Sequence, residues 1–226
     1  RKVSDALDRW PAGVLVEEYI VGRDLAVPFL ESVDNDFDGV LAPVEYVVMP
    51  ELLQGRRYAI YDYDLKSRSD KAVTVRAPAN ISEEMSDRLR KMARAVYKKL
   101  DCKDLGRIDF RLSDAGVPYF LEINALPSLE PGAGIYASAA LEGLHFDGVL
   151  DAVIQNAARR YRIKEKPRGL SKPTRRGPLQ VGFTFNVKRI KPTVEGEDRE
   201  AEYDSPTTLQ AIREAIASHG HEVIDL

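Results

Sequence analysis

Residues 106–124 read GRIDFRLSDAGVPYFLEIN, and this stretch restricts the fold of the chain more than any other. Apolar and polar residues alternate near 106–112 and again near 117–124, and the SDAG sequence between them is typical of a turn. The pattern predicts an antiparallel hairpin in which successive side chains point to opposite faces.

The polar residues of this hairpin fall on shared faces. Arg107, Asp109 and Arg111 share one face of the first strand, and Glu122 and Asn124 share one face of the second. Both sets can converge at one end of the hairpin. Carboxylate and amide oxygens suit Mg²⁺, and a nearby arginine can stabilise a phosphoryl group during transfer. The alternative is a hairpin whose polar face only contacts water.

Upstream of the hairpin the pattern predicts further strands and a loop. Residues 14–31 alternate apolar and polar residues around Gly22, which predicts two strands joined at that glycine. Residues 40–50 predict a strand with an edge or bulge proline at Pro43. Residues 51–72 are polar and aromatic without a clear period, which indicates a long loop of a kind that is often functional.

Two segments have the pattern of amphipathic helices. Residues 82–100 begin with Ser82 as a good N-cap, carry acids in the first turn and lysines in the last. A second helix is predicted at about 146–161. The apolar stripe of the first helix consists of Met85, Leu89, Met92, Ala93, Val96 and Leu100.

The composition changes after the second helix. Residues 159–177 contain nine Lys or Arg and one Glu, which predicts a solvated linker, with a phosphate-binding arm as the alternative. Residues 179–187 then predict a strand. A helix follows with Ser205 as its N-cap and Gly220 just past its end, and the chain closes on the strand-like HEVIDL. Strand, helix and strand predict the beginning of a parallel α/β layer.

Composition excludes several classes of protein. The net charge of −3 gives no indication of nucleic-acid binding, and the apolar runs are too short to cross a membrane. The single cysteine, Cys102, cannot form an intrachain disulfide, which fits a reducing compartment. We therefore expect a cytoplasmic protein without nucleic-acid or membrane partners. The three histidines, His145, His219 and His221, show no metal-ligand spacing and are expected to be structural or exposed.

The segments GRIDF and YFLEINALPSL resemble the C-terminal metal-binding segment of the D-alanine–D-alanine ligases, within the ATP-grasp superfamily. VEEYIVGRDLAV (16–27) resembles the hinge strand of that family, and YDYDLKSRSD (61–70) resembles its loop over the phosphates. The resemblance covers about residues 14–160. It implies an α+β fold, in which an ATP-grasp C-terminal subdomain of antiparallel sheet and helices precedes a partial α/β Rossmann-like segment.

The resemblance implies catalytic and metal-binding roles for residues that match its motifs. Asp109, Glu122 and Asn124 would hold one or two Mg²⁺ (or Mn²⁺) ions that bridge the phosphates of ATP, the nucleotide substrate. Arg107 would stabilise the transferring phosphoryl group, and Lys66 would reach the γ-phosphate.

It also implies a set of nucleotide ligands. Glu17 would accept from the adenine amino group, and the backbone that follows it would complete the adenine clamp. Asp24 would bind the ribose hydroxyls, and Leu121 would pack under the base. The full set is Glu17, Glu18, Tyr19, Ile20, Asp24 and Leu121.

The implied reaction joins a carboxylate to an amine. ATP phosphorylates the carboxylate, and the amine of an amino acid displaces phosphate to form a dipeptide for peptidoglycan in cell wall biogenesis. The substrate end departs from the family, because Ser128 stands in place of a glycine and Ala133 and Gly134 occupy the positions of a Ser-Leu pair. Another dipeptide or a depsipeptide is therefore an alternative product, and a non-catalytic nucleotide-binding module is the alternative class.

The resemblance divides the chain into three parts. Residues 1–162 correspond to the C-terminal part of an ATP-grasp domain, residues 163–178 form the basic linker, and residues 179–226 resemble the start of an N-terminal Rossmann-like domain. The simplest interpretation is a tandem protein with a second ATP-grasp unit in the same chain. A circular permutation or a homodimer are the alternatives. In the family, a glutamate before the first helix of this domain helps to hold the first D-alanine. In this chain, the residues near that position are Glu202, Asp204 and Ser205. We expect the chain alone to be inactive.

Overall fold

The computed structural model describes residues 2–54, 58, 73–163, 179–188 and 203–226. Lys66, most of the basic linker and Glu202 lie outside the described residues. The elements in chain order are α1 (Lys2–Arg9), β1 (Gly22–Leu30), β2 (Val44–Val48), α2 (Pro50–Leu53), β3 (Val73–Arg76), α4 (Glu83–Lys99), β4 (Leu105–Ser113), β5 (Pro118–Asn124), α5 (Gly134–Ala139), the 3₁₀ turn η1 (Ala140–Glu142), α6 (Phe146–Arg160), β6 (Gln180–Phe183), α7 (Pro206–Ser218) and β7 (Glu222–Asp225).

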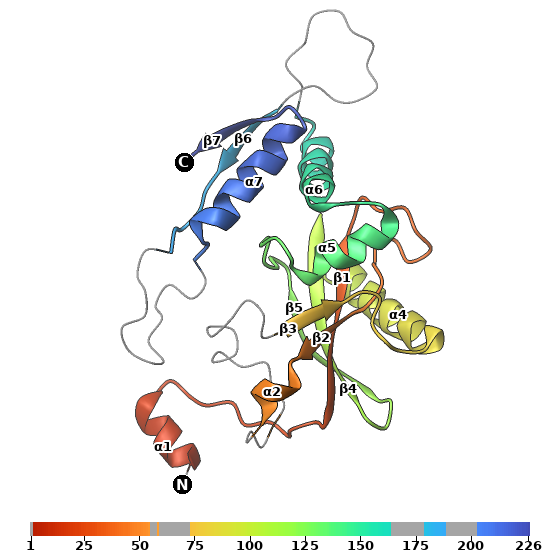
Figure 1. The fold of residues 1–226 in the computed structure, drawn as a ribbon, viewed down its shortest axis with the longest axis vertical. Coiled ribbons are helices and arrows are strands. Elements are labelled where there is room, and N and C mark those ends of the chain that lie inside the picture. Colours follow the sequence, from red (N-terminus) through yellow and green to blue (C-terminus); the bar gives the residue numbers. More distant parts are fainter. Residues whose placement is uncertain (1, 55–57, 59–72, 164–178, 189–202) are drawn as a thin grey trace, which may run out of the picture.

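Five strands form an antiparallel sheet in the order β3-β2-β1-β4-β5 (Figure 1). The predicted hairpin is present as β4 and β5. Strand β1 pairs with β4 along its whole length, from Gly22 opposite Ser113 to Leu30 opposite Leu105. Strand β4 is therefore internal to the sheet, with β1 on one side and β5 on the other.

Helix α4 covers one face of this sheet and confirms the predicted helix and its cap. The Ser82 side chain accepts a hydrogen bond from the amide of Met85 at 3.2 Å. Alternate residues of β1 and β4 pack against the buried side chains of this helix. Together they form the first core cluster, which contains Leu25, Val27, Phe29, Leu89, Ala93, Tyr97, Ile108, Phe110 and Leu112.

One residue of the predicted apolar stripe is wrong. Leu100 is 57% exposed, and Tyr97 is buried in its place. The ring of Tyr97 stacks on Phe29 with centroids 4.6 Å apart, and its hydroxyl donates to the carbonyl of Val27 at 2.9 Å. A tyrosine can enter this core because its hydroxyl finds a backbone acceptor there.

Helices α5 and α6 pack on the other face, where Leu30, Leu41, Ile135 and Val149 are buried together. Helix α6 is also held at the start of β4 by a polar contact. The Arg160 guanidinium donates to both carboxylate oxygens of Asp104, and these bonds lower the pKa of Asp104 below its ordinary value. The sheet is thus fixed between α4 and the α5–α6 pair.

Three strand predictions need correction. Residues 14–21 form no strand, and β1 begins only at Gly22, where φ is 156° and a Cβ would lie 2.0 Å from the Leu112 carbonyl oxygen. The expected strand at 40–50 begins only at Val44; Pro43 lies outside it, and its carbonyl accepts from the amide of Ala79. The expected strand at 179–187 ends at Phe183. The expected long loop begins with the short helix α2.

The C-terminal segment forms the predicted strand–helix–strand order. Strands β6 and β7 pair in parallel, and the Ser205 side chain caps α7 by accepting from the amide of Thr208. Helix α7 packs on α6 through a third apolar cluster, which contains Leu150, Ile212, Ala215 and Ile216. The segment therefore shares buried surface with the first part of the chain rather than standing apart from it (Figure 1).

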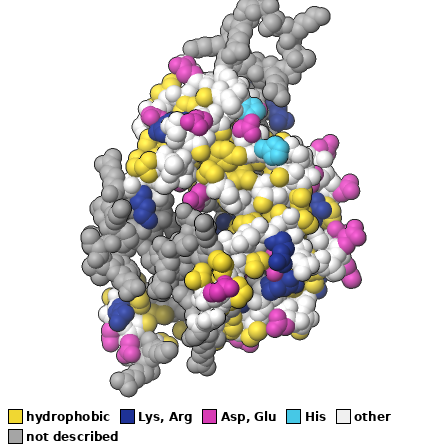
Figure 2. Space-filling model, viewed as in Figure 1, with side chains coloured by type: hydrophobic (Ala, Val, Ile, Leu, Met, Phe, Trp, Pro, Cys, Tyr) yellow, Lys and Arg dark blue, Asp and Glu magenta, His cyan; other side chains and the backbone are white. Residues whose placement is uncertain are grey.

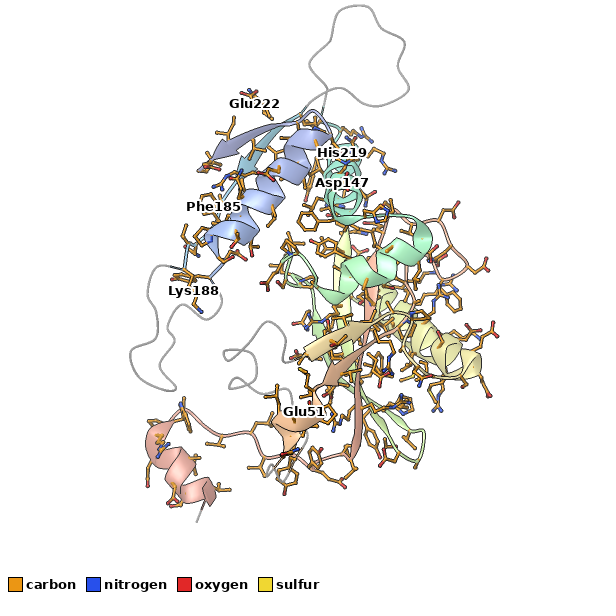
Figure 3. All side chains as sticks on the ribbon, viewed as in Figure 1. Glu51, Asp147, Phe185, Lys188, His219 and Glu222 are labelled. Atoms are coloured by element: carbon orange, nitrogen blue, oxygen red, sulfur yellow. The ribbon has the colours of Figure 1, made fainter. Side chains whose placement is uncertain are left out.

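Two histidines join this segment to α6, as a structural role predicts. His221 is buried, receives a hydrogen bond on Nδ1 from the amide of Leu179 and contacts Asp151 through Nε2 at 2.9 Å. His219 Nε2 lies 3.1 Å from Asp147 Oδ2 (Figure 3). Because Nδ1 of His221 accepts a bond, its neutral form carries the proton on Nε2, facing Asp151.

The described residues contain no helix that is both long and apolar enough to cross a membrane. On the face drawn in Figure 2, basic side chains occur singly or in small groups among acidic ones, with apolar side chains exposed between them.

The contact between Asp147 and His219 predicts a pH-dependent stability. The hydrogen bond from His219 lowers the pKa of Asp147, so its carboxylate stabilises the folded state above the pKa of the unfolded chain. That contribution is lost as the pH falls through the folded-state pKa. The thermal midpoint of the wild type should exceed that of Asp147→Asn above about pH 5, and the difference should vanish below about pH 2.

Thermal unfolding followed by circular dichroism across this pH range measures the difference. In a His219→Gln background the same Asp147→Asn change should have little pH-dependent effect. A midpoint difference that stays constant or grows in acid would contradict the assignment.

Candidate functional site

The polar residues of the hairpin lie together, as the strand pattern predicts. Asp109 is paired with Glu122 and Arg107 with Asn124 in the β4–β5 ladder. Arg107 donates from Nε and Nη2 to the two oxygens of Asp109, at 2.7 and 2.8 Å. The amide of Asn124 donates to Asp109 at 3.1 Å and to Glu122 at 3.3 Å. Two carboxylates, one amide and one guanidinium thus meet on one face of the sheet.

A β-bulge lets β5 place Phe120 on the core face and Glu122 on the polar face. Phe110 is paired with Phe120, whereas the preceding residue, Asp109, is paired with Glu122, so Leu121 is the extra residue. Without the bulge, the period of the strand would place Phe120 and Glu122 on the same face. With it, Phe120 lies opposite core residue Phe110 at a ring distance of 6.0 Å, and Glu122 lies opposite Asp109. The extra residue, Leu121, is 53% exposed.

The ion pair between Arg107 and Asp109 is partly shielded from water. Their side chains are 24% and 21% exposed. Burial opposes the charge of Arg107, but its bonds to Asp109 outweigh that effect and raise the pKa of the guanidinium. A bidentate arginine–carboxylate pair of this kind fixes both side chains geometrically.

The donor set fits a hard divalent cation. The carboxylates of Asp109 and Glu122 and the amide of Asn124 offer oxygen ligands only, which suits Mg²⁺. The described residues hold no cluster of three or more His, Cys, Asp or Glu side chains that could bind a metal. A cation on this face would therefore have two acidic ligands, and its remaining ligands would come from the amide, water or a phosphate.

Most of the expected nucleotide ligands lie in and just before β1, near the end of β4 that carries Arg111. Glu17 and Glu18 are exposed, and Tyr19 and Ile20 are half-buried. Asp24 on β1 is held by Arg111 on β4, whose Nη1 lies 2.6 Å from its Oδ1. The strand pattern predicted that Arg111 lies on the same face as Asp109, but no function was predicted for it. Its partner is distant in the sequence, so only the β1–β4 register could have revealed the pair.

The expected substrate end forms a turn before α5. Ser128 is exposed, and its hydroxyl accepts from the amide of Glu130 at 3.2 Å. Gly134 opens α5 so close to the sheet that a Cβ there would lie 2.7 Å from the hydroxyl oxygen of Tyr46. Lys66 falls outside the described residues, so its expected place over the phosphates stays a prediction.

The shielding of the Arg107–Asp109 pair predicts strong energetic coupling. Asp109→Asn leaves a half-buried guanidinium without its counter-charge, which should lower the free energy of unfolding by about 1–3 kcal/mol. The double variant Arg107→Met/Asp109→Asn should lose less than the sum of the single variants, with a coupling of about 1–2 kcal/mol.

Urea unfolding of the four proteins measures this coupling. Arg213 and Asp225 provide a matched control, because they form a similar two-point pair at 3.0 Å in which Asp225 is 54% exposed. Their coupling should be below about 1 kcal/mol. Equal coupling in the two pairs would contradict the role assigned to shielding.

Comparisons with known proteins identify the relatives of this chain. The family model for the D-ala D-ala ligase C-terminus matches residues 1–155. A D-alanine–D-alanine ligase of Bacillus anthracis (strain CDC 684 / NRRL 3495) is 28% identical over 150 residues, which cover 66% of this chain and 44% of that protein. The ligase of Thermotoga maritima (strain ATCC 43589 / DSM 3109 / JCM 10099 / NBRC 100826 / MSB8) is 33% identical over 145 residues, covering 64% and 44%.

The fold is also similar to a solved structure. The crystal structure of the Bacillus anthracis ligase complexed with ATP matches with a TM-score of 0.54 and 20% identity, covering 71% of this chain and 47% of that one. The matched part spans less than half the length of these relatives. Because the family model accounts for more than half of the chain, the chain belongs to the D-alanine–D-alanine ligase family, to whose C-terminal ATP-grasp part residues 1–155 correspond.

Proposed function

We propose that residues 1–162 form the metal- and phosphate-binding part of an ATP-dependent ligase, which joins a carboxylate to the amine of an amino acid through an acyl-phosphate. The hairpin face carries the proposal, because Arg107, Asp109, Glu122 and Asn124 converge on it within hydrogen-bonding distance. The relatives are named D-alanine–D-alanine ligases, which supports a D-alanyl-D-alanine product.

Three residues would hold the cation that the reaction needs. Asp109, Glu122 and Asn124 supply hard oxygens for Mg²⁺ or Mn²⁺. When bound, the ion stabilises charge on the phosphate oxygens as a Lewis acid. Arg107 keeps Asp109 in place by its two hydrogen bonds, and its fixed positive charge would stabilise the transferring phosphoryl group.

The hinge would receive the nucleotide. Glu17 would accept from the adenine amino group beside the backbone of Glu18, Tyr19 and Ile20, while Asp24 would bind the ribose and Leu121 would pack under the base. The exposure of Glu17, Glu18 and Leu121 leaves them accessible to a ligand. The similar Bacillus anthracis structure was solved in complex with ATP, which supports ATP as the nucleotide. Lys66 would reach the γ-phosphate.

The residues expected to bind the amino-acid substrates differ from those of the family. Ser128 and the turn before α5 would face the substrates. At Gly134, which takes a position of the Ser-Leu pair that the resemblance implies, an added Cβ would lie 2.7 Å from the Tyr46 hydroxyl oxygen. These departures favour a test against several amino acids rather than D-alanine alone. Another dipeptide or a depsipeptide is the second candidate product.

We also propose that the C-terminal segment begins a further unit. Residues 163–178 would form a basic linker. Residues 179–226 would begin an N-terminal Rossmann-like domain, which would belong to a second ATP-grasp unit in the same protein. A homodimer is the alternative. The parallel pairing of β6 with β7 around α7 supports an α/β beginning. The match covers 44% of the length of the Bacillus anthracis ligase, and we propose that the chain is inactive on its own.

Turnover by the complete protein that carries this chain tests the proposal. Phosphate release from ATP and Mg²⁺ should be stimulated by D-alanine or another member of an amino-acid panel. The double variant Asp109→Ala/Glu122→Ala should lower kcat by about 100-fold or more, because the hard ligands of the ion are lost. Mass spectrometry of the product identifies the dipeptide or depsipeptide.

The matched control removes two exposed carboxylates on other elements, in Glu84→Ala/Glu142→Ala, and should retain wild-type turnover. Stimulation by an amino acid other than D-alanine would preserve the mechanism and change the substrate. No stimulation by any acceptor, together with an unaffected metal-site variant, would refute the ligase proposal in favour of a binding module.

A further inference from the structure

Arg111 is a buried cation whose place in the site the ligase chemistry does not explain. It is 7% exposed and lies two positions after Asp109 on the same face of β4. A buried guanidinium is costly unless its charge is paired and its donors are used. The position of its partners therefore indicates what the residue does.

Arg111 donates hydrogen bonds to three groups of the hinge segment, defined here as residues 16–24. Its Nε donates to the carbonyl of Ile20 at 3.0 Å, and its Nη2 donates to the Tyr19 hydroxyl at 3.0 Å. Its Nη1 donates to Oδ1 of Asp24 at 2.6 Å. The guanidinium carbon also lies 5.4 Å from the centroid of the Tyr19 ring. One planar side chain thus contacts the hinge segment at three points.

The hinge segment has little other regular structure to fix it. Residues 16–21 belong to no strand, and Val16 and Val21 are 67% and 61% exposed. The carbonyl of Val21 accepts a long bond of 3.4 Å from the amide of Asp114 in the hairpin turn. Only from Gly22 onward does the β1–β4 ladder hold the backbone. The Arg111 guanidinium therefore ties Tyr19 and Ile20, which lie ahead of the ladder, to the sheet.

We infer that Arg111 is a nucleotide-positioning residue that holds the hinge backbone and the Asp24 carboxylate in the arrangement that receives the ribose and base of ATP. This inference rests on the proposed function and deepens it. Arg111 itself need not touch the nucleotide, since it acts through Asp24 and the backbone at Ile20.

The charge on Asp24 makes such a partner necessary. An isolated carboxylate close to a bound triphosphate would repel it, and Arg111 compensates that charge. The bond from Arg111 uses Oδ1 of Asp24, and no described residue donates to its Oδ2. The Asp24 side chain is 27% exposed, so Oδ2 is available to accept from a ribose hydroxyl. Lysine could supply the charge but not the planar fork.

The first measurement concerns the hinge and needs no nucleotide. NMR order parameters of the 226-residue chain should be high at residues 19–21 in the wild type and fall below about 0.6 in Arg111→Met. Arg23→Met is the matched control, because Arg23 lies beside Asp24 but donates to Glu45 and to the Asn80 carbonyl. It should leave the order parameters of residues 19–21 unchanged.

The second measurement is the kinetics of the complete protein. Arg111→Met should raise KM for ATP by about tenfold to a hundredfold and change kcat by less than about threefold, because a charge-assisted contact is lost from binding alone. The preference for ATP over 2′-deoxy-ATP should fall in Arg111→Met and in Asp24→Asn. The KM for ATP of the Arg111→Met/Asp24→Asn double variant should exceed that of the more affected single variant by no more than about twofold, because both substitutions remove the same contact. Arg111→Lys should recover part of the affinity.

The outcomes separate this inference from the proposed function. Unchanged order parameters in Arg111→Met, or a fall in order without any change in KM, would overturn the positioning role. A wild type that does not turn over ATP with any amino acid would overturn the proposed function, whatever the order parameters show. If Arg111→Met does not fold, Arg111→Lys and Asp24→Asn decide the result through the same KM and nucleotide-preference comparison.

Discussion

The pairing of β4 with β1 on one side and β5 on the other is the constraint on which the rest of the structure depends. Because strand side chains alternate, β4 buries Ile108, Phe110 and Leu112 under α4 and presents Arg107, Asp109 and Arg111 on the opposite face. A register shift of one residue would exchange these two sets. The same ladder that builds the core therefore places the candidate site.

Charge pairing governs the polar parts of this sheet. Arg107 is paired with Asp109, and Arg111 with Asp24. Glu45 is 5% exposed and receives bonds from Arg23, Arg76 and the amide of Asn80. These pairs are not an efficient source of stability, because desolvation offsets much of their attraction. Their value is positional, since each fixes the direction of a side chain on a surface that apolar packing cannot define.

Local sequence signals predicted the elements with strong periodicity and clear caps. The hairpin, α4 with its Ser82 cap and α7 with its Ser205 cap all depend on contacts within a few residues, so the sequence contains them directly. The convergence of Asp109, Glu122 and Asn124 follows from the same period. The family resemblance, also visible in these motifs, agrees with the family match.

The features that the sequence did not reveal all depend on distant partners. The extra residue Leu121 is required by the pairing of Phe120 with Phe110, and neither a glycine nor a proline marks that bulge. Residues 14–21 have a strand-like pattern, but β4 pairs with β1 only from Gly22 onward. Tyr97 replaces Leu100 in the core because a carbonyl on β1 accepts its hydroxyl. The Arg111–Asp24 pair likewise needs the strand register.

We propose that the hairpin face of Asp109, Glu122 and Asn124 binds the metal that accompanies ATP. The most direct measurement is anomalous X-ray scattering from crystals of the complete protein grown with Mn²⁺ and a non-hydrolysable ATP analogue. We expect a manganese peak within about 2.0–2.3 Å of oxygens from Asp109 and Glu122, with phosphate oxygens as its remaining ligands. A bound analogue whose manganese contacts neither carboxylate would contradict it.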